Sequence, residues 1–138
     1  MERFQKPLFT LLEWRSDKFH NGTYALSNML PDLEYRFRAN DVECRFAVEC
    51  KWRSSFVKGE IQWAKQYQLD NYIKFAYEKR TPVFVIIGIG GTPDNPQSLY
   101  IIPLTNINSI FLDRRELQKY YRPGKGNFFF NAERCLLK

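Results

Sequence analysis

Asp32, Glu49 and Lys51 are the residues of this chain whose types and spacing best suit chemistry. Asp32 directly follows Pro31, and one residue separates Glu49 from Lys51. Carboxylates bind hard divalent cations through oxygen, and a lysine ammonium stabilises negative charge that develops during a reaction. His20 is the only histidine, which argues against a Ser/His triad or a histidine-rich metal site. Any catalysis is therefore expected to use carboxylates and lysines.

The elements that must position these residues show in the alternation of apolar and polar side chains. Residues 33–38 and 42–53 alternate in this way on either side of a short turn at residues 40–41. The pattern predicts two antiparallel strands joined as a β-hairpin. With that turn, Leu33 faces Val48 and the apolar sides of the two strands coincide. A slip of one residue would break the match, so the register is well specified.

The same register places Asp32 opposite Glu49 on the polar face of the hairpin. Directly opposed Cβ atoms lie about 4.5–5.5 Å apart. Lys51 points to the same side as Glu49, about 7 Å further along the strand. Two carboxylates this close repel each other, and a bound divalent cation relieves the repulsion. Mg²⁺ suits such a site because it takes oxygen ligands and keeps water molecules that can act as nucleophiles.

Downstream of the hairpin, the apolar spacing predicts a helix over residues 59–80, ended by Pro82. Residues 83–89 are apolar on both faces and predict a buried central strand. Residues 20–31 and 88–96 are expected to be loops and residues 99–104 a strand. Residues 8–14 fit a strand or the end of a helix, 113–121 a short helix and 128–130 a last strand. The helix is expected to turn its apolar side to the core through Ile61, Ala64, Gln68, Leu69, Tyr72, Ile73, Phe75 and Ala76. Together these elements predict an α/β domain with a mixed sheet.

The order and spacing of these motifs resemble the PD-(D/E)XK, or restriction-endonuclease-like, nuclease superfamily. Pro31-Asp32, followed after a spacer by Glu49-Cys50-Lys51, is similar to its signature. Residues 68–72, which begin with Gln68 and end with Tyr72, are similar to the QxxxY helix motif of several of its branches. The resemblance covers residues 32–104. It implies a restriction-endonuclease-like mixed β-sheet flanked by helices.

What the resemblance implies for the chemistry follows position by position. Asp32 and Glu49 would ligate Mg²⁺, with Mn²⁺ as a substitute, helped by the main-chain carbonyl of Cys50. Lys51 would orient the attacking water and stabilise charge on the scissile phosphate. Gln68 would hold the geometry of the site. The implied reaction is hydrolysis of a phosphodiester bond by in-line attack.

The N-terminal part of the chain departs from the family pattern. The resemblance also implies that Tyr72 supports the site from the same helix face as Gln68. In the family, a further helix usually precedes the first strand, and the present sequence has little room for it. Pro7 interrupts the few residues available, so a complete N-terminal helix is not expected. That helix often carries a further acidic residue, for which Glu13 or Asp17 would have to substitute.

The basic residues point to a polyanionic partner. The chain has 21 Lys and Arg against 15 Asp and Glu, a formal net charge of +6. Arg53 and Lys58 follow the motif and are candidates to guide a nucleic-acid backbone, although basic surface residues of this kind are usually just solvated. A late basic patch is a further candidate for phosphate contacts and contains Arg114, Arg115, Lys119, Arg122 and Lys125.

Several other features narrow the class of protein. No apolar run approaches the roughly 18 residues of a membrane span, so no membrane is expected and the setting is taken as cytoplasmic. Cys44, Cys50 and Cys135 form no CxxC pair, which argues against a disulfide scaffold or a structural zinc site. Pro93-Asp94 repeats the Pro-Asp dipeptide, but no Glu-x-Lys follows it. Residues 1–138 are expected to form a single nuclease-like domain.

The leading hypothesis is a Mg²⁺-dependent DNA endonuclease or exonuclease that works in restriction, repair or mobile-element processing. The alternative is a non-catalytic nucleic-acid- or partner-binding module that retains the nuclease fold, and a third hypothesis is a structural domain of a larger protein. The strandedness of the substrate and the choice between DNA and RNA stay open. The oligomeric state also stays open: cutting both strands of a duplex would need either a homodimer or two successive cleavage events.

Overall fold

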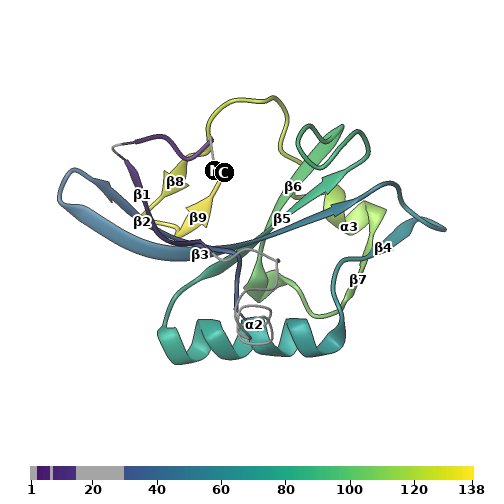
Figure 1. The fold of residues 1–138 in the computed structure, drawn as a ribbon, viewed down its shortest axis with the longest axis horizontal. Coiled ribbons are helices and arrows are strands. Elements are labelled where there is room, and N and C mark those ends of the chain that lie inside the picture. The colour runs from purple at the N-terminus through teal and green to yellow at the C-terminus, as the bar shows by residue number, and fades with distance from the viewer. Residues whose placement is uncertain (1–2, 7, 15–29) are drawn as a thin grey trace, which may run out of the picture.

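A five-stranded mixed sheet forms the centre of the computed structural model, which describes residues 3–6, 8–14 and 30–138 (Figure 1). The order of strands is β1-β2-β3-β5-β6. β3 and β5 are parallel, and the other neighbours are antiparallel. The predicted α/β architecture with a mixed sheet is confirmed. The strands are β1 (Phe9–Trp14), β2 (Leu33–Ala39), β3 (Val42–Arg53), β5 (Val83–Ile89) and β6 (Ser98–Pro103).

The β2–β3 hairpin has the predicted register. Leu33 pairs with Val48, and the pairing continues without a shift to the turn. Asn40 and Asp41 occupy the turn with φ angles of 49° and 67°, in the left-handed region. Two consecutive residues with positive φ are typical of the type I′ turn, whose twist matches that of the strands. The turn and the apolar alternation therefore specify the same pairing.

The long helix begins later than predicted. Helix α2 spans Gln66–Lys79, whereas the apolar spacing predicted a helix from residue 59. Residues 60–62 instead form a short strand, β4 (Glu60–Gln62), which pairs with β7 (Phe111–Asp113) in a separate small sheet. Ile61 and Ala64 are buried as expected, but they reach the core from this strand and the segment after it. The predicted helical periodicity was therefore wrong before residue 66.

One residue of the helix that was predicted to face the core is exposed to solvent instead. Ile73 is 48% exposed, whereas Leu69, Tyr72 and Phe75 are buried. The buried residues recur every three positions, so the packed stripe of α2 is narrower than predicted. The helix ends at Arg80, whose left-handed conformation turns the chain toward β5 before Pro82.

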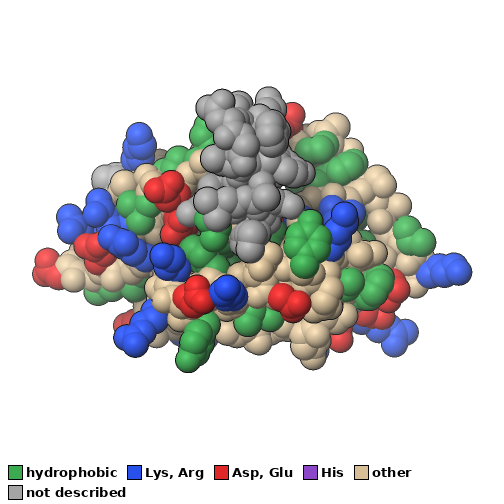
Figure 2. Space-filling view, turned by 60° about the horizontal axis from the view of Figure 1, so that its bottom comes forward, with side chains coloured by type: hydrophobic (Ala, Val, Ile, Leu, Met, Phe, Trp, Pro, Cys, Tyr) green, Lys and Arg blue, Asp and Glu red, His purple; other side chains and the backbone are tan. Residues whose placement is uncertain are grey.

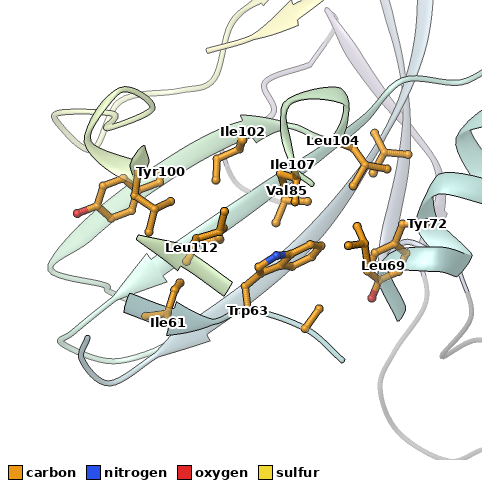
Figure 3. Close-up of a cluster of buried hydrophobic side chains, with 14 of the residues drawn as sticks. Ile61, Trp63, Leu69, Tyr72, Val85, Tyr100, Ile102, Leu104, Ile107 and Leu112 are labelled. Carbon is orange, nitrogen blue, oxygen red and sulfur yellow. The ribbon is translucent and has the colours of Figure 1, made fainter. Parts of the chain in front are cut away.

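Two apolar clusters cover the two faces of the central sheet. On the first face, α2 packs against side chains of β3, β5 and β6, and Figure 3 shows Trp63 at the centre of this cluster. Trp63 is fully buried and stacks with Tyr72 at 6.2 Å between ring centroids. The second cluster is rich in aromatic rings, including Phe4, Phe46 and Phe130. Much of the high aromatic content is thus explained by packing.

The C-terminal hairpin and the segment before β1 cover the second face. β8 (Phe130–Asn131) pairs with β9 (Leu136–Leu137), so the predicted last strand starts two residues late. A 3-10 turn, η1 (Leu104–Asn106), follows β6, and α3 (Arg114–Gln118) is the predicted short helix. No helix occurs among the residues described before β1, and residues 20–29 of a predicted loop lie outside the described residues. Within the described part of the chain, no helix is long and apolar enough to span a membrane.

Candidate active site

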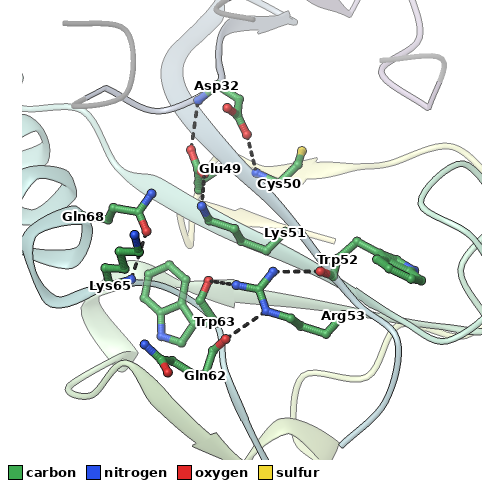
Figure 4. Close-up of polar contacts among 10 residues, drawn as sticks. All are labelled: Asp32, Glu49, Cys50, Lys51, Trp52, Arg53, Gln62, Trp63, Lys65 and Gln68. Carbon is green, nitrogen blue, oxygen red and sulfur yellow. Dashed lines mark hydrogen bonds and ion pairs between the residues drawn. The ribbon is translucent and has the colours of Figure 1, made fainter. Parts of the chain in front are cut away.

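Asp32 and Glu49 are joined through two backbone N–H groups. The backbone N–H of Asp32 donates to Oε1 of Glu49 at 3.2 Å, and that of Cys50 donates to Oδ2 of Asp32 at 2.9 Å (Figure 4). Each carboxylate therefore accepts a hydrogen bond from the strand that carries the other. Hydrogen bonds to an ionised acceptor are short and strong, and they hold the acceptor in place. The predicted juxtaposition of the two acids is present.

Lys51 completes the cluster at Glu49. Its Nζ lies 3.0 Å from Oε2 of Glu49, and the side chains of the two residues are 15% and 4% exposed. Among the residues that the structure describes, Glu49 is the only charged residue that is buried. A low local dielectric strengthens the attraction between the pair, but burial of a charge is costly. Ionisable groups held at such a cost are often functional.

The length of β3 explains why these residues lie together. β2 begins at Leu33, opposite Val48, so it does not pair with residues 49–53 of β3. These residues pair with β5 on their other side, where Glu49 lies opposite Val85 and Lys51 opposite Ile87. Because side chains alternate along a strand, Glu49 and Lys51 share the α2 face of the sheet. Asp32 directly precedes β2 and approaches them from there. Because β3 is a central strand of the sheet, it holds Glu49 and Lys51 rigidly.

The side chain of Cys50 lies on the opposite face from its two neighbours. Burial, and then negative charge at Cys50, raise the pKa of Tyr35 to about 12. Tyr35 belongs to the aromatic cluster on the second face of the sheet. The predicted metal ligand at this position is the carbonyl of Cys50, which lies in the strand between the two faces. Its thiol points away from Glu49 and Lys51.

Gln68 and Tyr72 stand on the first turns of α2. Oε1 of Gln68 accepts the backbone N–H of Lys65 at 2.9 Å and closes a capping box at the start of the helix. Tyr72 is 1% exposed and packs on Trp63. These contacts explain both residues as parts of the helix and its packing. Their predicted roles at the active site stay predictions.

Arg53 has a structural task that its sequence position did not reveal. Its guanidinium donates to the carbonyls of Trp52, Gln62 and Trp63 at 2.7–2.9 Å (Figure 4). These bonds connect the end of β3 to β4 and to the residue that follows it. Lys58 is exposed and occupies a tight turn with φ of 52°. Contact of either residue with nucleic acid stays a prediction.

The two carboxylates of Asp32 and Glu49 are a donor set that could hold a divalent cation. Two carboxylates come together at Asp32 and Glu49, and within the described residues no group of three or more His, Cys, Asp or Glu side chains converges. A structural zinc site needs four protein ligands. Mg²⁺, in contrast, is commonly held by one or two carboxylates and keeps several waters. The charge pattern of the pair also fits, because a cation would offset two neighbouring anions.

The five-stranded mixed sheet, with helix α2 crossing over between the parallel strands β3 and β5, has the restriction-endonuclease-like α/β fold. A solved structure with this fold is that of a Holliday junction resolvase from Archaeoglobus fulgidus, an archaeal hyperthermophile. The two align with a TM-score of 0.52 and 11% sequence identity, over 81% of this chain and 80% of the resolvase. No family model and no curated protein matches the chain by sequence.

Proposed function

We propose that this protein is a metal-dependent nuclease that hydrolyses phosphodiester bonds of DNA. The observation that carries the proposal is the linked set of Asp32, Glu49 and Lys51, with a carboxylate buried beside an ammonium at 3.0 Å. A fold can host unrelated functions, so the argument rests on these side chains. The net charge of +6 supports a polyanionic substrate.

The roles of the residues follow from their placement. Asp32 and Glu49, with the carbonyl of Cys50, would hold Mg²⁺ or Mn²⁺. When bound, the metal would polarise the phosphate and lower the pKa of a water ligand. Lys51 would donate hydrogen bonds to the attacking water and to a phosphate oxygen. Glu49 holds the ammonium in place for this task, and the rigid β3–β5 pairing limits the reorganisation that the reaction requires.

The class of DNA substrate is the finer part of the proposal. The resolvase that shares this fold is named for Holliday junctions. A four-way junction therefore belongs among the substrates to be tried, beside duplex and single-stranded DNA. A role in restriction, repair or mobile-element processing would each require cleavage of at least one of these. We expect residues 1–138 to act as a single nuclease-like domain.

The experiment compares the wild-type protein with Lys51→Ala on supercoiled plasmid, single-stranded DNA and a four-way junction. Each substrate is incubated with Mg²⁺, with Mn²⁺ and with a chelator. Cleavage that requires the metal and disappears in the variant would support the nuclease. Equal cleavage by both proteins would reveal a contaminating nuclease. If both are folded, bind DNA and leave it intact, the alternative of a non-catalytic binding module replaces the proposal.

A further inference from the structure

Two arginines from distant parts of the chain lie against one aromatic ring. The guanidinium carbons of Arg3 and Arg122 are 5.7 and 4.7 Å from the centroid of the Phe128 ring. The backbone also ties these segments, because the N–H of Phe128 donates to the carbonyl of Arg3 at 2.7 Å. Arginine stacks well on aromatic faces, which holds its planar group in a defined orientation.

The charges of this arginine pair are poorly compensated. Within the described residues, neither guanidinium forms an ion pair with a carboxylate. One terminal nitrogen (Nη1) of each arginine is buried and has no hydrogen-bond partner in the part of the chain that the structure describes. The other terminal nitrogen of Arg122 donates to the carbonyls of Gly126 and Asn127. Burial, and then the nearby charge of Arg3, lower the pKa of Arg122. Two like charges held close together with unused donors are stabilised by an anion.

A hollow beside the pair leads to the catalytic strand. It encloses about 500 Å³ and is lined by Arg3 and Phe128 together with Cys50, Lys51 and Trp52 of β3. Asp94 also lines it and is its one acidic side chain. This hollow borders residues 50–52, a stretch of β3 with which β2 does not pair. The Glu49–Lys51 ion pair and the arginine hollow thus flank the same few residues of β3.

We propose that Arg3, which lines the hollow and has the charge of Arg122 close to it, binds a phosphate group of a nucleic-acid strand that passes the end of β3. The inference rests on the proposed function, since that strand is the substrate of the carboxylate site. The guanidinium fork matches phosphate oxygens in geometry and charge. Trp52 in the same hollow offers a ring on which a base can stack, and stacking tolerates any sequence. The arginine pair thereby positions the strand for the acids on the other side of β3.

The test measures binding of fluorescein-labelled single-stranded and duplex DNA by anisotropy, in a chelator and over a series of salt concentrations. Arg3→Met removes the charge and keeps an unbranched stem against Phe128. Arg3→Lys keeps a charge without the planar fork. Lys74→Met is the matched control, because Lys74 is exposed on α2 and pairs only with Glu78 at 4.0 Å among the described residues. Thermal unfolding shows whether each variant is folded.

Arg3→Met is expected to weaken binding about tenfold at low salt and to reduce the slope of log affinity against log salt by about one. Arg3→Lys is expected to keep the slope, and Lys74→Met to behave as wild type. Equal affinity and slope for Arg3→Met and wild type would overturn the inference, as would a wild-type protein that binds no DNA. Failure of the proposed function is distinct. It would appear as DNA binding that is sensitive to Arg3 but is followed by no cleavage when Mg²⁺ is added.

Discussion

Glu49 carries a negative charge at a position where its side chain is only 4% exposed. Its two oxygens accept from the backbone N–H of Asp32 and from Nζ of Lys51, which replace the water that a solvated carboxylate would have. This arrangement costs stability in comparison with an apolar residue of the same shape. The proposed role in metal binding and catalysis would explain why an acid occupies this position.

Removal of Lys51 is therefore expected to destabilise the fold as well as to abolish cleavage. Lys51→Ala leaves the buried Glu49 carboxylate without its cation, and we expect a loss of about 2 kcal/mol in the free energy of unfolding. Arg38→Ala is the control, because the Arg38–Glu43 pair has a similar length of 3.0 Å but is 66% and 39% exposed. Exposed ion pairs contribute little to the free energy of unfolding. Urea denaturation of both variants measures the difference, and equal losses would contradict the importance of burial.

Metal binding can be tested at Glu49 without any activity assay. Glu49→Gln keeps an oxygen that can accept from the Asp32 N–H but removes the charge that a cation would seek. For wild type, Mg²⁺ at 100 times its Kd would stabilise the fold by about 2.7 kcal/mol and raise Tm by about 9 °C. The variant is expected to show almost no rise. If its Tm rises with Mg²⁺ as much as that of wild type, Glu49 is not a ligand.

At the scale of elements, helix α2 shows where sequence periodicity misleads. Ile61, Ala64 and Gln68 recur at helical spacing, yet only the last lies in the helix. The first two are buried because β4 pairs with β7, and this segment packs in the same apolar cluster as the buried residues of α2. Strands of three residues are too short to show an alternating pattern. The start of α2 also lacks a Ser, Thr, Asp or Asn cap, since Lys65 occupies that position.

The capping contact of Gln68 can be separated from its predicted role at the site. Gln68→Ala removes the acceptor for the Lys65 N–H and is expected to cost about 1 kcal/mol in the free energy of unfolding. Gln68→Glu keeps that acceptor and places an acid in the first turn, so stability is expected to match wild type. Thermal unfolding measures both. Unchanged stability of Gln68→Ala would refute the cap.

Cleavage assays of the same two variants then address the site. If Gln68 also positions the catalytic groups, Gln68→Glu would be stable but impaired in cleavage. If Gln68 serves the helix alone, Gln68→Glu would cleave as wild type. The comparison depends on the stability of the variant being intact, which the capping measurement establishes first.

The hairpin, in contrast, could be predicted in detail. Its turn, its register and the position of Asp32 beside Glu49 all follow from local alternation and from residues 40–41. Local patterns carry this information because the two strands are adjacent in sequence. The carboxylate set was predictable for the same reason.

At the scale of the whole molecule, the placement of the two arginines on Phe128 depends on contacts between segments that are distant in sequence. Residues 3–6 and the β8–β9 hairpin lie over the same face of the sheet and bring Arg3 beside Arg122 (Figure 1). No local pattern records such a pairing, so the sequence placed Arg122 only in a general basic patch. The structural hydrogen bonds of Arg53 could not be predicted from the sequence for the same reason, because the carbonyls that accept them belong to β4 and the segment after it.

The distribution of charge over the α2 side of the molecule bears on how DNA would approach. Figure 2 shows basic and acidic side chains interspersed over much of this view, with basic ones most frequent at the end where Figure 1 places the β2–β3 turn. The exposed Arg38 and Arg45 belong to that hairpin. The net charge of +6 is thus not a uniform field on this face. Long-range attraction would be weak at physiological salt, where charges are screened beyond about 8 Å.

The central claim is that the carboxylates of Asp32 and Glu49 make this protein a nuclease. The most direct measurement compares the cleavage rates of wild type, Asp32→Asn and Asp41→Asn on the DNA that wild type cleaves best. The two variants carry the same change, but Asp41 is exposed in the hairpin turn, where asparagine fits the left-handed backbone, and only Asp32 accepts the Cys50 N–H beside Glu49. We predict that Asp32→Asn lowers the Mg²⁺-dependent rate by about 100-fold or more, whereas Asp41→Asn stays within about threefold of wild type. Equal rates for the two folded variants would contradict the assignment of the active site.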